Sequence, residues 1–231
     1  MTQVAFTKMH GLGNDFVIVD GRDGDLAIGG TQARAIGDRR RGVGFDQLLI
    51  LEPAKDAAAD LFMRILNPDG SEAEACGNGT RCVAARVMDE LGRDTLNIET
   101  VAGVLATTTG ADGLVTVDMG PANLEWRQIP LAVEADTLHL DIENGPLRDP
   151  VAVNIGNPHM VFFVDDADAI DVAGLGPALE SHPLYPERTN VEICSLSGPD
   201  QLRMRVWERG AGITQACGSG ACAAGVAAAR R

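Results

Sequence analysis

The chain has 231 residues, of which 45% are hydrophobic and 23% charged, enough to bury the core of one large domain or two small ones. Its formal net charge of -14 weighs against nucleic acids and anionic membranes as partners. No apolar run reaches the length of a membrane-spanning helix and no signal peptide is visible, so we expect a cytoplasmic protein with reduced cysteines.

The first half of the chain, residues 1–120, predicts a domain of short strands and two helices. Strands are predicted at 4–9, 16–20, 48–52, 61–66, 95–101, 104–109 and 114–118. Thr31 is expected to cap a helix over 32–40, and the arginines at 39–41 to form its solvated end. A second helix is predicted over 78–91, since Val83, Val87 and Leu91 recur with a helical period.

The second half, residues 121–231, follows a crossing between the domains at 120–129. Its strands are predicted at 151–155, 160–164, 190–195 and 202–208. Residues 218–229 predict a helix built almost wholly of Ala, Gly, Cys and Val. Because no face of this helix is polar, we expect it to be buried all round, with the sheet packed closely against it.

Two short phrases, one in each half, are alike. One runs from Cys76 to Cys82 with the sequence CGNGTRC, and the other runs from Cys217 to Cys222 with the sequence CGSGAC. A thiol at the start of a helix lies beside unpaired backbone N–H groups and the positive end of the helix dipole, which lowers its pKa. Two such thiols predict a matched pair of acid–base groups that act on one substrate.

The similarity of the two halves extends beyond these cysteines. In each half, polar residues lie at nearly equal distances before the cysteine. Counted back from Cys76 and Cys217, the matched pairs are Asn14 with Asn157 and Asn67 with Glu208. Each half therefore has the same order of strand, Asn-bearing turn, further strands, polar turn, cysteine and helix. This order predicts two domains of one design that face each other across a cleft.

The paired thiols suit one kind of chemistry. A proton on the carbon next to a carboxylate is weakly acidic, so its removal needs a base in contact and stabilisation of the developing charge. Pyridoxal enzymes bind their cofactor through a lysine, but Lys8 and Lys55 have no phosphate-cradling glycine loop, so we expect no cofactor. A thiolate on one face of the carbon and a thiol on the other would invert it, while the glycine-rich helix starts hold the carboxylate.

Other uses of the five cysteines fit the sequence less well. A zinc site needs close Cys or His pairs, and neither the cysteine spacings nor the four scattered histidines provide them, so no metal is expected. A redox C-x-x-C motif is absent. Cys82, Cys194 and Cys222 are interpreted as small buried hydrophobic residues.

Several longer phrases of the chain resemble the diaminopimelate epimerase family. They lie in the family's order at 10–16 (HGLGNDF), 46–49 (DQLL), 67–81, 156–159 (GNPH), 189–192 (TNVE), 208–212 and 216–222. The resemblance implies an α+β fold of two pseudo-symmetric domains, each a mostly antiparallel sheet wrapped around a buried helix. It also implies interconversion of LL- and meso-2,6-diaminoheptanedioate without a cofactor, in lysine and peptidoglycan precursor synthesis.

The same resemblance implies roles for residues in both halves. Cys76 and Cys217 would be the catalytic acid and base, and His159 and Glu208 would tune their pKa values. Glu208 would also bind an ammonium group, and Arg209 would pair with the distal carboxylate. The remaining substrate-binding residues would be Asn14, Gln47, Asn67, Gly77, Asn78, Asn157, Asn190, Gly218 and Ser219.

The chain departs from the usual pattern of the family in places. Ile213, Phe45 and Trp207 stand where a Glu, a small residue and a Tyr are usual. The chain is also expected to be truncated at its C-terminus, because family members usually continue with strands that complete the sheets and support a homodimer.

Two alternative functions stay open from the sequence. One is a racemase or epimerase of the same fold that acts on a proline-like amino acid, and the other is a non-catalytic binder of amino acids. Glu208 and Arg209 argue against the first, because proline has no distal carboxylate or ammonium group to meet them. The presence of both thiols argues against the second.

Overall fold

The computed structural model describes residues 3–24 and 26–231. The chain divides between Gly120 and Pro121 into two compact units, which we call unit 1 and unit 2. Each unit is described by itself below.

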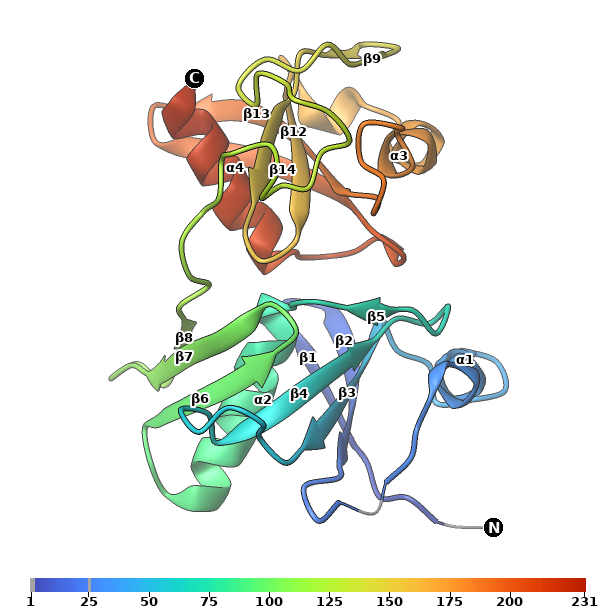
Figure 1. Cartoon of the computed structure of the whole chain (residues 1–231), viewed down its shortest axis with the longest axis vertical. Coiled ribbons are helices and arrows are strands. Elements are labelled where there is room, and N and C mark those ends of the chain that lie inside the picture. The colour runs from blue at the N-terminus through green and yellow to red at the C-terminus, as the bar shows by residue number, and fades with distance from the viewer. Residues whose placement is uncertain (1–2, 25) are drawn as a thin grey trace. The chain divides into compact units, whose positions relative to one another are not determined.

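Unit 1 is built on one curled sheet (Figure 1). Its strands are β1 (Thr7–Gly11), β2 (Asn14–Asp20), β3 (Gln47–Glu52), β4 (Leu61–Leu66), β5 (Glu72–Ala73), β6 (Thr95–Thr100), β7 (Gly103–Thr109) and β8 (Val115–Val117). They lie in the order β1-β2-β3-β4-β6-β7-β8, and β5 pairs with β4. Only the β2–β3 and β4–β6 pairs are parallel, so the sheet is mostly antiparallel.

Helices cover both faces of this sheet, because its central strands are apolar on both sides. Phe16 and Ile18 of β2 belong to the cluster packed on α2 (Gly77–Leu91). The alternating Val17 and Val19 belong to the cluster beside α1 (Gly30–Gly37). Successive residues of a strand point to opposite faces, so β2 holds a helix on each side, as Figure 1 shows for α1 and α2.

The central helix α2 is long and well capped. Cys76 caps its start, and Gly92 ends it in the left-handed conformation, with φ of 64°. Val83, Ala84 and Val87 are fully buried against the strands. A helix ended by glycine in this conformation is a stable design, because glycine alone adopts it without strain.

Unit 2 repeats the first part of this topology. Its sheet contains β11 (Val151–Asn154), β12 (Pro158–Phe163), β13 (Asn190–Gly198), β14 (Gln201–Glu208) and β15 (Gly212–Ile213). Their order and directions match β1 to β5, with the second and third strands parallel and the other pairs antiparallel. A separate hairpin contains β9 (Glu143–Asn144) and β10 (Leu147–Arg148).

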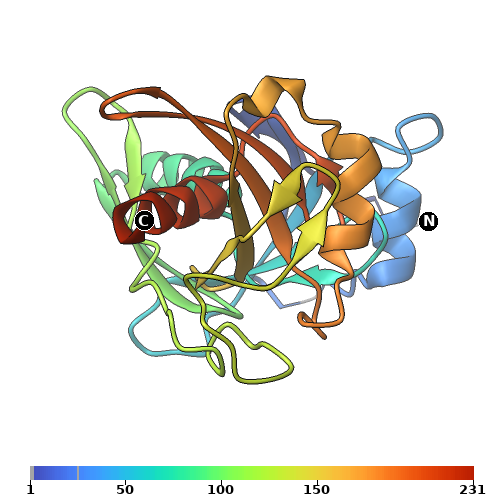
Figure 2. The same ribbon diagram turned by 90° about the horizontal axis from the view of Figure 1, so that it is seen from above.

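Two helices flank the sheet of unit 2 on opposite sides (Figure 2). On one side lies α4 (Gly218–Arg230), which begins at its cap residue Cys217. On the other side lies α3 (Val172–Glu180), preceded by a short 3-10 turn at Ala167–Ala169. The cluster beside α3 is a large apolar core that includes Met160 and Phe162. The protein therefore has the expected α+β fold, with two pseudo-symmetric units in which a mostly antiparallel sheet packs on the helix that follows the cysteine.

Several short elements were not predicted, and some predicted limits are wrong. The unpredicted elements are α3, β5, β9, β10 and β15. The first helix is capped by Gly29 rather than Thr31 and ends at Gly37. It stops there because the chain turns back, and Val43 N and Gly44 N both donate to Ile36 O.

The prediction that the helix at residues 218–229 is buried all round is also wrong. Ala221, Cys222, Gly225 and Ala229 of α4 are exposed, so one face of this apolar helix is open in unit 2. Cys222 is consequently not the buried residue that the sequence suggested. Cys82 and Cys194 are buried as predicted.

Candidate active site

Cys76 lies at the start of α2, where the sequence placed it. Its Sγ accepts the backbone N–H of Gly79 at 3.3 Å, and the residue is only 8% exposed. A Cβ on Gly79 would lie 3.0 Å from Leu49 Cδ1 and 3.4 Å from Cys76 Sγ. Glycine is therefore needed for the strand and the thiol to approach the helix start so closely.

A chain of hydrogen bonds leads from α2 through two candidate binding residues. Arg81 Nη2 donates to Asn78 Oδ1 at 2.5 Å, and Asn78 Nδ2 donates to Asn14 Oδ1 at 3.4 Å. Asn14 Nδ2 in turn donates to Asp46 Oδ2 at 2.9 Å. An arginine can only donate and a carboxylate can only accept. The two ends of the chain therefore fix which way both buried amides point.

Asp46 is itself held by an ion-pair network. Its Oδ1 accepts from Arg39 Nη2 at 2.7 Å, and Arg39 also binds Asp15, which Lys8 contacts from the other side. Partial burial raises the pKa of Asp15, but hydrogen bonds from Arg39 and Lys8 outweigh burial and hold that pKa far below its usual value. Arg39 is exposed, as predicted, and it also supports the site through its ion pair with Asp46.

A second polar pair lies at the ends of β3 and β4. Gln47 Nε2 donates to Asn67 Oδ1 at 3.1 Å, and Asn67 Nδ2 donates to Ser71 Oγ at 3.1 Å. Gln47 Oε1 is buried and has no partner among the described residues. A buried acceptor without a donor is costly, so this oxygen is a natural contact for a ligand that donates hydrogen bonds.

Cys217 repeats the arrangement of Cys76 at the start of α4. Its Sγ accepts the N–H of Gly220 at 3.4 Å and lies 3.6 Å from Ser219 Oγ. Burial raises the pKa of Cys217 well above its usual value, and the carboxylates of Glu208 and Glu192 raise it further. Contacts with Ser219 and Gly220 lower the pKa but do not offset burial. The lowered pKa predicted from the helix start is therefore wrong for this thiol.

His159 lies between two oxygen atoms inside unit 2. Its Nδ1 is 2.7 Å from Glu192 Oε1, and its Nε2 is 2.8 Å from Asn157 Oδ1. His159 and Glu192 are both fully buried, and Glu192 Oε2 has no partner among the described residues. The sequence placed His159 and Asn157 in the site, but it assigned no role to Glu192.

The remaining candidate residues of unit 2 lie around the turn that follows β14. Asn190 Oδ1 accepts the backbone N–H of Arg209 at 2.9 Å, and Asn190 Nδ2 donates to Pro158 O at 3.0 Å. Arg209 Nη1 donates to Glu187 O at 3.0 Å. Glu208 Oε1 accepts from the hydroxyl of Thr214. Asn190 therefore ties the Arg209 turn to β12.

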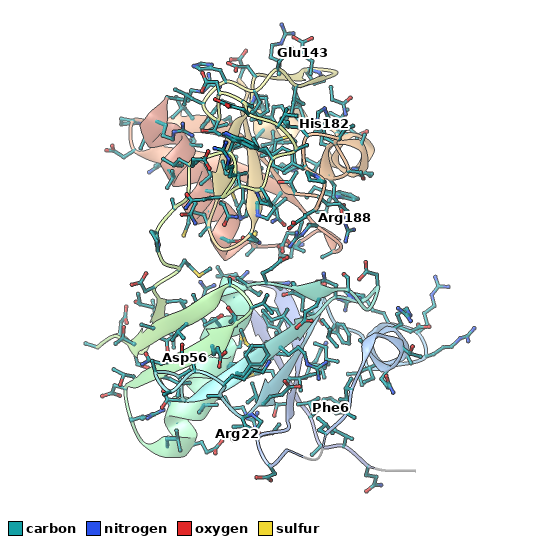
Figure 3. All side chains as sticks on the ribbon, in the orientation of Figure 1. Phe6, Arg22, Asp56, Glu143, His182 and Arg188 are labelled. Carbon is teal, nitrogen blue, oxygen red and sulfur yellow. The ribbon has the colours of Figure 1, made fainter. Side chains whose placement is uncertain are left out.

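Glu180, at the end of α3, also holds this turn in place. Its Oε1 accepts from Gly210 N and from Arg188 Nη1, each at 3.0 Å, and its Oε2 accepts from Trp207 Nε1 at 2.6 Å. Arg188 is labelled in Figure 3 and lies beyond the end of α3. A Cβ on Gly176 would lie 2.5 Å from the Trp207 ring, so glycine makes room for this tryptophan.

The structure also shows where the other two departures from the family pattern, Phe45 and Ile213, lie. Phe45 is buried in the core beside α1, where its ring packs against Gly37. Ile213 lies in the short strand β15 and is half exposed.

No group of three or more His, Cys, Asp or Glu residues in the described part of the chain has an arrangement that holds a metal ion. No helix among these residues is long and apolar enough to cross a membrane.

Within each unit, the structure brings several of the predicted residues into contact. In unit 1, Cys76, Gly77 and Asn78 form the helix start, where Asn78 contacts Asn14, and Gln47 and Asn67 form a second pair. In unit 2, Cys217, Gly218 and Ser219 form the helix start, with Glu208 and Glu192 close enough to raise the pKa of the thiol. That both thiols face one cleft stays a prediction.

Comparison with known proteins identifies the family. The family model described as diaminopimelate epimerase matches residues 6–125 and 151–231, which include every candidate site residue. A diaminopimelate epimerase of Rhodospirillum centenum is 61% identical over 98% of this chain and 78% of its own length. One of Erythrobacter litoralis is 51% identical over 99% of this chain and 82% of its own length. The chain belongs to the diaminopimelate epimerase family.

Solved structures with the same architecture are more distant. A hydroxyproline epimerase from Agrobacterium vitis is 18% identical, with a TM-score of 0.69 over 97% of this chain and 76% of that chain. A probable proline racemase from Agrobacterium radiobacter K84 is 16% identical, with a TM-score of 0.69 over 99% of this chain and 78% of that chain. These two support the fold alone. The diaminopimelate epimerase family consists of isomerases, which makes this protein an enzyme of that class.

Proposed function

We propose that the protein interconverts LL- and meso-2,6-diaminoheptanedioate, with Cys76 and Cys217 as its two acid–base groups. The observation that carries the proposal is the repeated helix start. Each thiol caps one helix, accepts an N–H from the third residue beyond it and is 8% exposed. Two groups of one chemistry in equivalent places suit a reaction in which substrate and product differ only in the configuration of one carbon.

The proposed reaction moves one proton on each face of that carbon. One cysteine, as a thiolate, takes the proton from the carbon and becomes a thiol. The electron pair left on the carbon spreads into the adjacent carboxylate. The other cysteine, as a thiol, gives its proton to the opposite face and becomes a thiolate. The enzyme ends with the two thiols in exchanged protonation states, and the reverse reaction restores them.

The residues around each thiol supply binding groups for such a substrate. The N–H groups that follow Cys76 and Cys217 suit the reacting carboxylate, because a helix start favours negative charge. Arg209, Asn67 and Asn190 suit the distal carboxylate, and Glu208 suits an ammonium group. Asn14, Gln47 and Asn157 complete the polar surroundings, and His159 lies close enough to Glu192 to influence Cys217.

The proposal extends to the cellular setting of the enzyme. We place the reaction in lysine and peptidoglycan precursor synthesis. In this scheme the epimerisation itself needs no cofactor or metal. A cytoplasmic location and a homodimer belong to the same proposal. Sedimentation of the purified chain tests the dimer, and fractionation of cells tests the location.

The test of the reaction is exchange with solvent. In deuterium oxide, LL-diaminoheptanedioate should gain deuterium at one α-carbon as the meso isomer appears. Proline and glutamate serve as controls and should gain none, because they lack one or both of the distal groups. Exchange into proline at a comparable rate would favour the proline-type alternative, and exchange into no amino acid would favour a non-catalytic binder.

A further inference from the structure

The strand register identifies equivalent positions beneath the two thiols. In unit 1, Phe16 of β2 pairs with Gln47 of β3, the first pair of a parallel ladder. In unit 2, His159 of β12 pairs with Asn190 of β13 in the corresponding parallel ladder. Two residues further on the same face, β3 has Leu49 and β13 has Glu192. The apolar pair Phe16–Leu49 of unit 1 is therefore replaced in unit 2 by the pair His159–Glu192.

The glycines of the two helix starts support this equivalence independently. A Cβ on Gly79 would lie 3.0 Å from Leu49 Cδ1 and 3.4 Å from Cys76 Sγ. A Cβ on Gly220 would lie 2.7 Å from Glu192 Oε1 and 3.2 Å from Cys217 Sγ. Leu49 and Glu192 thus lie at the same place relative to the helix start and the thiol. The Glu192 carboxylate and the Cys217 thiol flank one glycine.

This buried pair is not needed to build the scaffold. Phe16 and Leu49 fill the same place in unit 1 with apolar side chains, and all four residues are fully buried. Burying a charged or polar pair costs free energy that an apolar pair does not. One carboxylate oxygen, Oε2 of Glu192, also lacks a partner among the described residues. A costly group at a place where an apolar one fits indicates a function beyond packing.

We infer that Glu192, paired with His159, is a positioning residue that controls the protonation of Cys217 and so makes the two thiols chemically unequal. The inference rests on the proposed role of Cys217 and deepens it. With the carboxylate beside it, Cys217 holds its proton, so it starts as the acid in the proposed reaction. At the equivalent place in unit 1, beside Cys76, lies the side chain of Leu49, which carries no charge.

Other ionisable groups lie near Glu192 and Cys217, and their effects on the ionisation of Cys217 can be separated from that of Glu192. Tyr185, between α3 and β13, lies against His159, and burial followed by Glu192 raises the pKa of its hydroxyl. Cys194, further along β13, has its pKa raised to about 12 by burial and Glu192. Both therefore stay neutral near pH 7. Glu208 of β14 acts on Cys217 in the same direction as Glu192, so a test must leave Glu208 unchanged.

The test measures ionisation of Cys217 directly. The rate of its alkylation by iodoacetamide is followed against pH by mass spectrometry of the peptide that contains it. In Glu192→Gln the midpoint of this profile should fall by about one pH unit or more, because a neighbouring like charge is removed without a change of shape. Asp168→Asn removes an exposed carboxylate of the same unit, which pairs with Arg203, and should leave the midpoint unchanged.

A second variant covers the case in which Glu192→Gln fails to fold. The double variant His159→Phe with Glu192→Leu places the pair of unit 1 in unit 2, and its Cys217 midpoint should also fall. A midpoint equal to that of the wild type in a folded variant overturns the inference. If Cys217 shifts but the pH–rate profile of epimerisation does not, Glu192 controls the thiol and the proposed catalytic role of Cys217 fails instead.

Discussion

The central helices of the two units begin alike and are covered differently. In unit 1, β6 and β7 extend the sheet beyond β4, and α2 packs against Leu96 and Ile98 of β6. The described part of unit 2 has no counterpart of β6 to β8 in its sheet. Ala221, Gly225 and Ala229 of α4 are exposed, whereas the α2 residues at the same distances from the cap cysteine are buried. Those buried residues are Thr80, Ala84 and Met88.

The two helices show which properties come from the repeated cysteine–glycine phrase and which come from the strands around it. The glycine-rich phrase alone produces the cap, because both thiols accept an N–H from the third residue beyond them. The chemistry of the thiol depends on the strands beneath it, where unit 1 has Leu49 and unit 2 has Glu192. A duplicated scaffold can therefore hold two thiols in the same geometry and still give them different tasks.

The largest expected effect tests whether both units are needed. Cys76→Ala and Cys217→Ala should each lower the rate of epimerisation by about 10²–10⁴-fold, because inversion needs a base on one face and an acid on the other. Each variant should keep a partial reaction, in which the remaining thiol exchanges the α-proton of one stereoisomer with solvent. The two variants should prefer opposite stereoisomers, as measured by deuterium uptake into LL- and meso-substrate.

Retention of near wild-type inversion by either variant would show that one thiol suffices. Thermal melting of both variants provides the control for folding. A loss of rate with an unchanged melting temperature assigns the effect to chemistry rather than to the scaffold.

Arg209 tests whether unit 2 recognises the distal end of the substrate. In Arg209→Lys a point charge replaces the planar fork of the guanidinium. Loss of a charged hydrogen bond costs about 1.5–3 kcal/mol, so KM should rise by roughly ten- to a hundredfold. The backbone contact of Arg209 N with Asn190 Oδ1 should persist and keep the turn in place. Kinetics equal to those of the wild type would remove Arg209 from the site.

Asp46 tests the corresponding polar chain in unit 1. Asp46 accepts with both oxygens, from Arg39 on one side and from Asn14 on the other. An asparagine side chain has only one acceptor oxygen. In Asp46→Asn the NH₂ group would therefore face one of these two donors and could not accept its hydrogen bond. We expect a loss of about 0.5–1.5 kcal/mol of binding free energy, seen as a higher KM with little change in kcat.

Asp60→Asn is the matched control for Asp46. Asp60 also accepts with both oxygens, from Arg93 and from Asn97 N, and in the described part of the chain no hydrogen bond joins it to Asn14. The Asp60→Asn variant should change the melting temperature by about as much as Asp46→Asn does, but it should leave KM unchanged. An equal rise of KM in both variants would mean that the effect of Asp46 is general destabilisation.

The parts of the fold that were predictable from sequence are local. The starts of α2 and α4 follow from a cysteine and glycines in consecutive positions, and most strands follow from apolar runs between turns. The helix α3 was not predictable in this way, because Gly174, Gly176 and Pro177 all disfavour a helix. Packing of Trp207 on Gly176 and the hydrogen bonds of Glu180 provide tertiary contacts that offset this preference.

The candidate site shows the same limit. Asn14, Asn67 and Asn157 drew notice because polar residues recur at similar distances before the two cysteines, and the family resemblance then assigned them to the site. Glu192 and Asp46 were not assigned roles, since their importance depends on which strand lies beside which and in what register. Two signals were available: both residues lie in phrases that resemble the family, and the spacing of Asn190 and Glu192 places both on the same face of a strand.

The smallest expected effect, that of a substitution at Cys222, is measured by a comparison of the two helices. Cys82 of α2 is buried among apolar residues, whereas Cys222 of α4 is exposed. Cys82→Ser places a hydroxyl in an apolar core and should lower the free energy of unfolding by about 1–3 kcal/mol. Cys222→Ser changes an exposed atom and should stay within about 0.5 kcal/mol of the wild type. Urea unfolding of the two variants measures both values. An equally large loss in Cys222→Ser would mean that the exposed face of α4 is covered in solution, and the contrast between the two helices would then disappear.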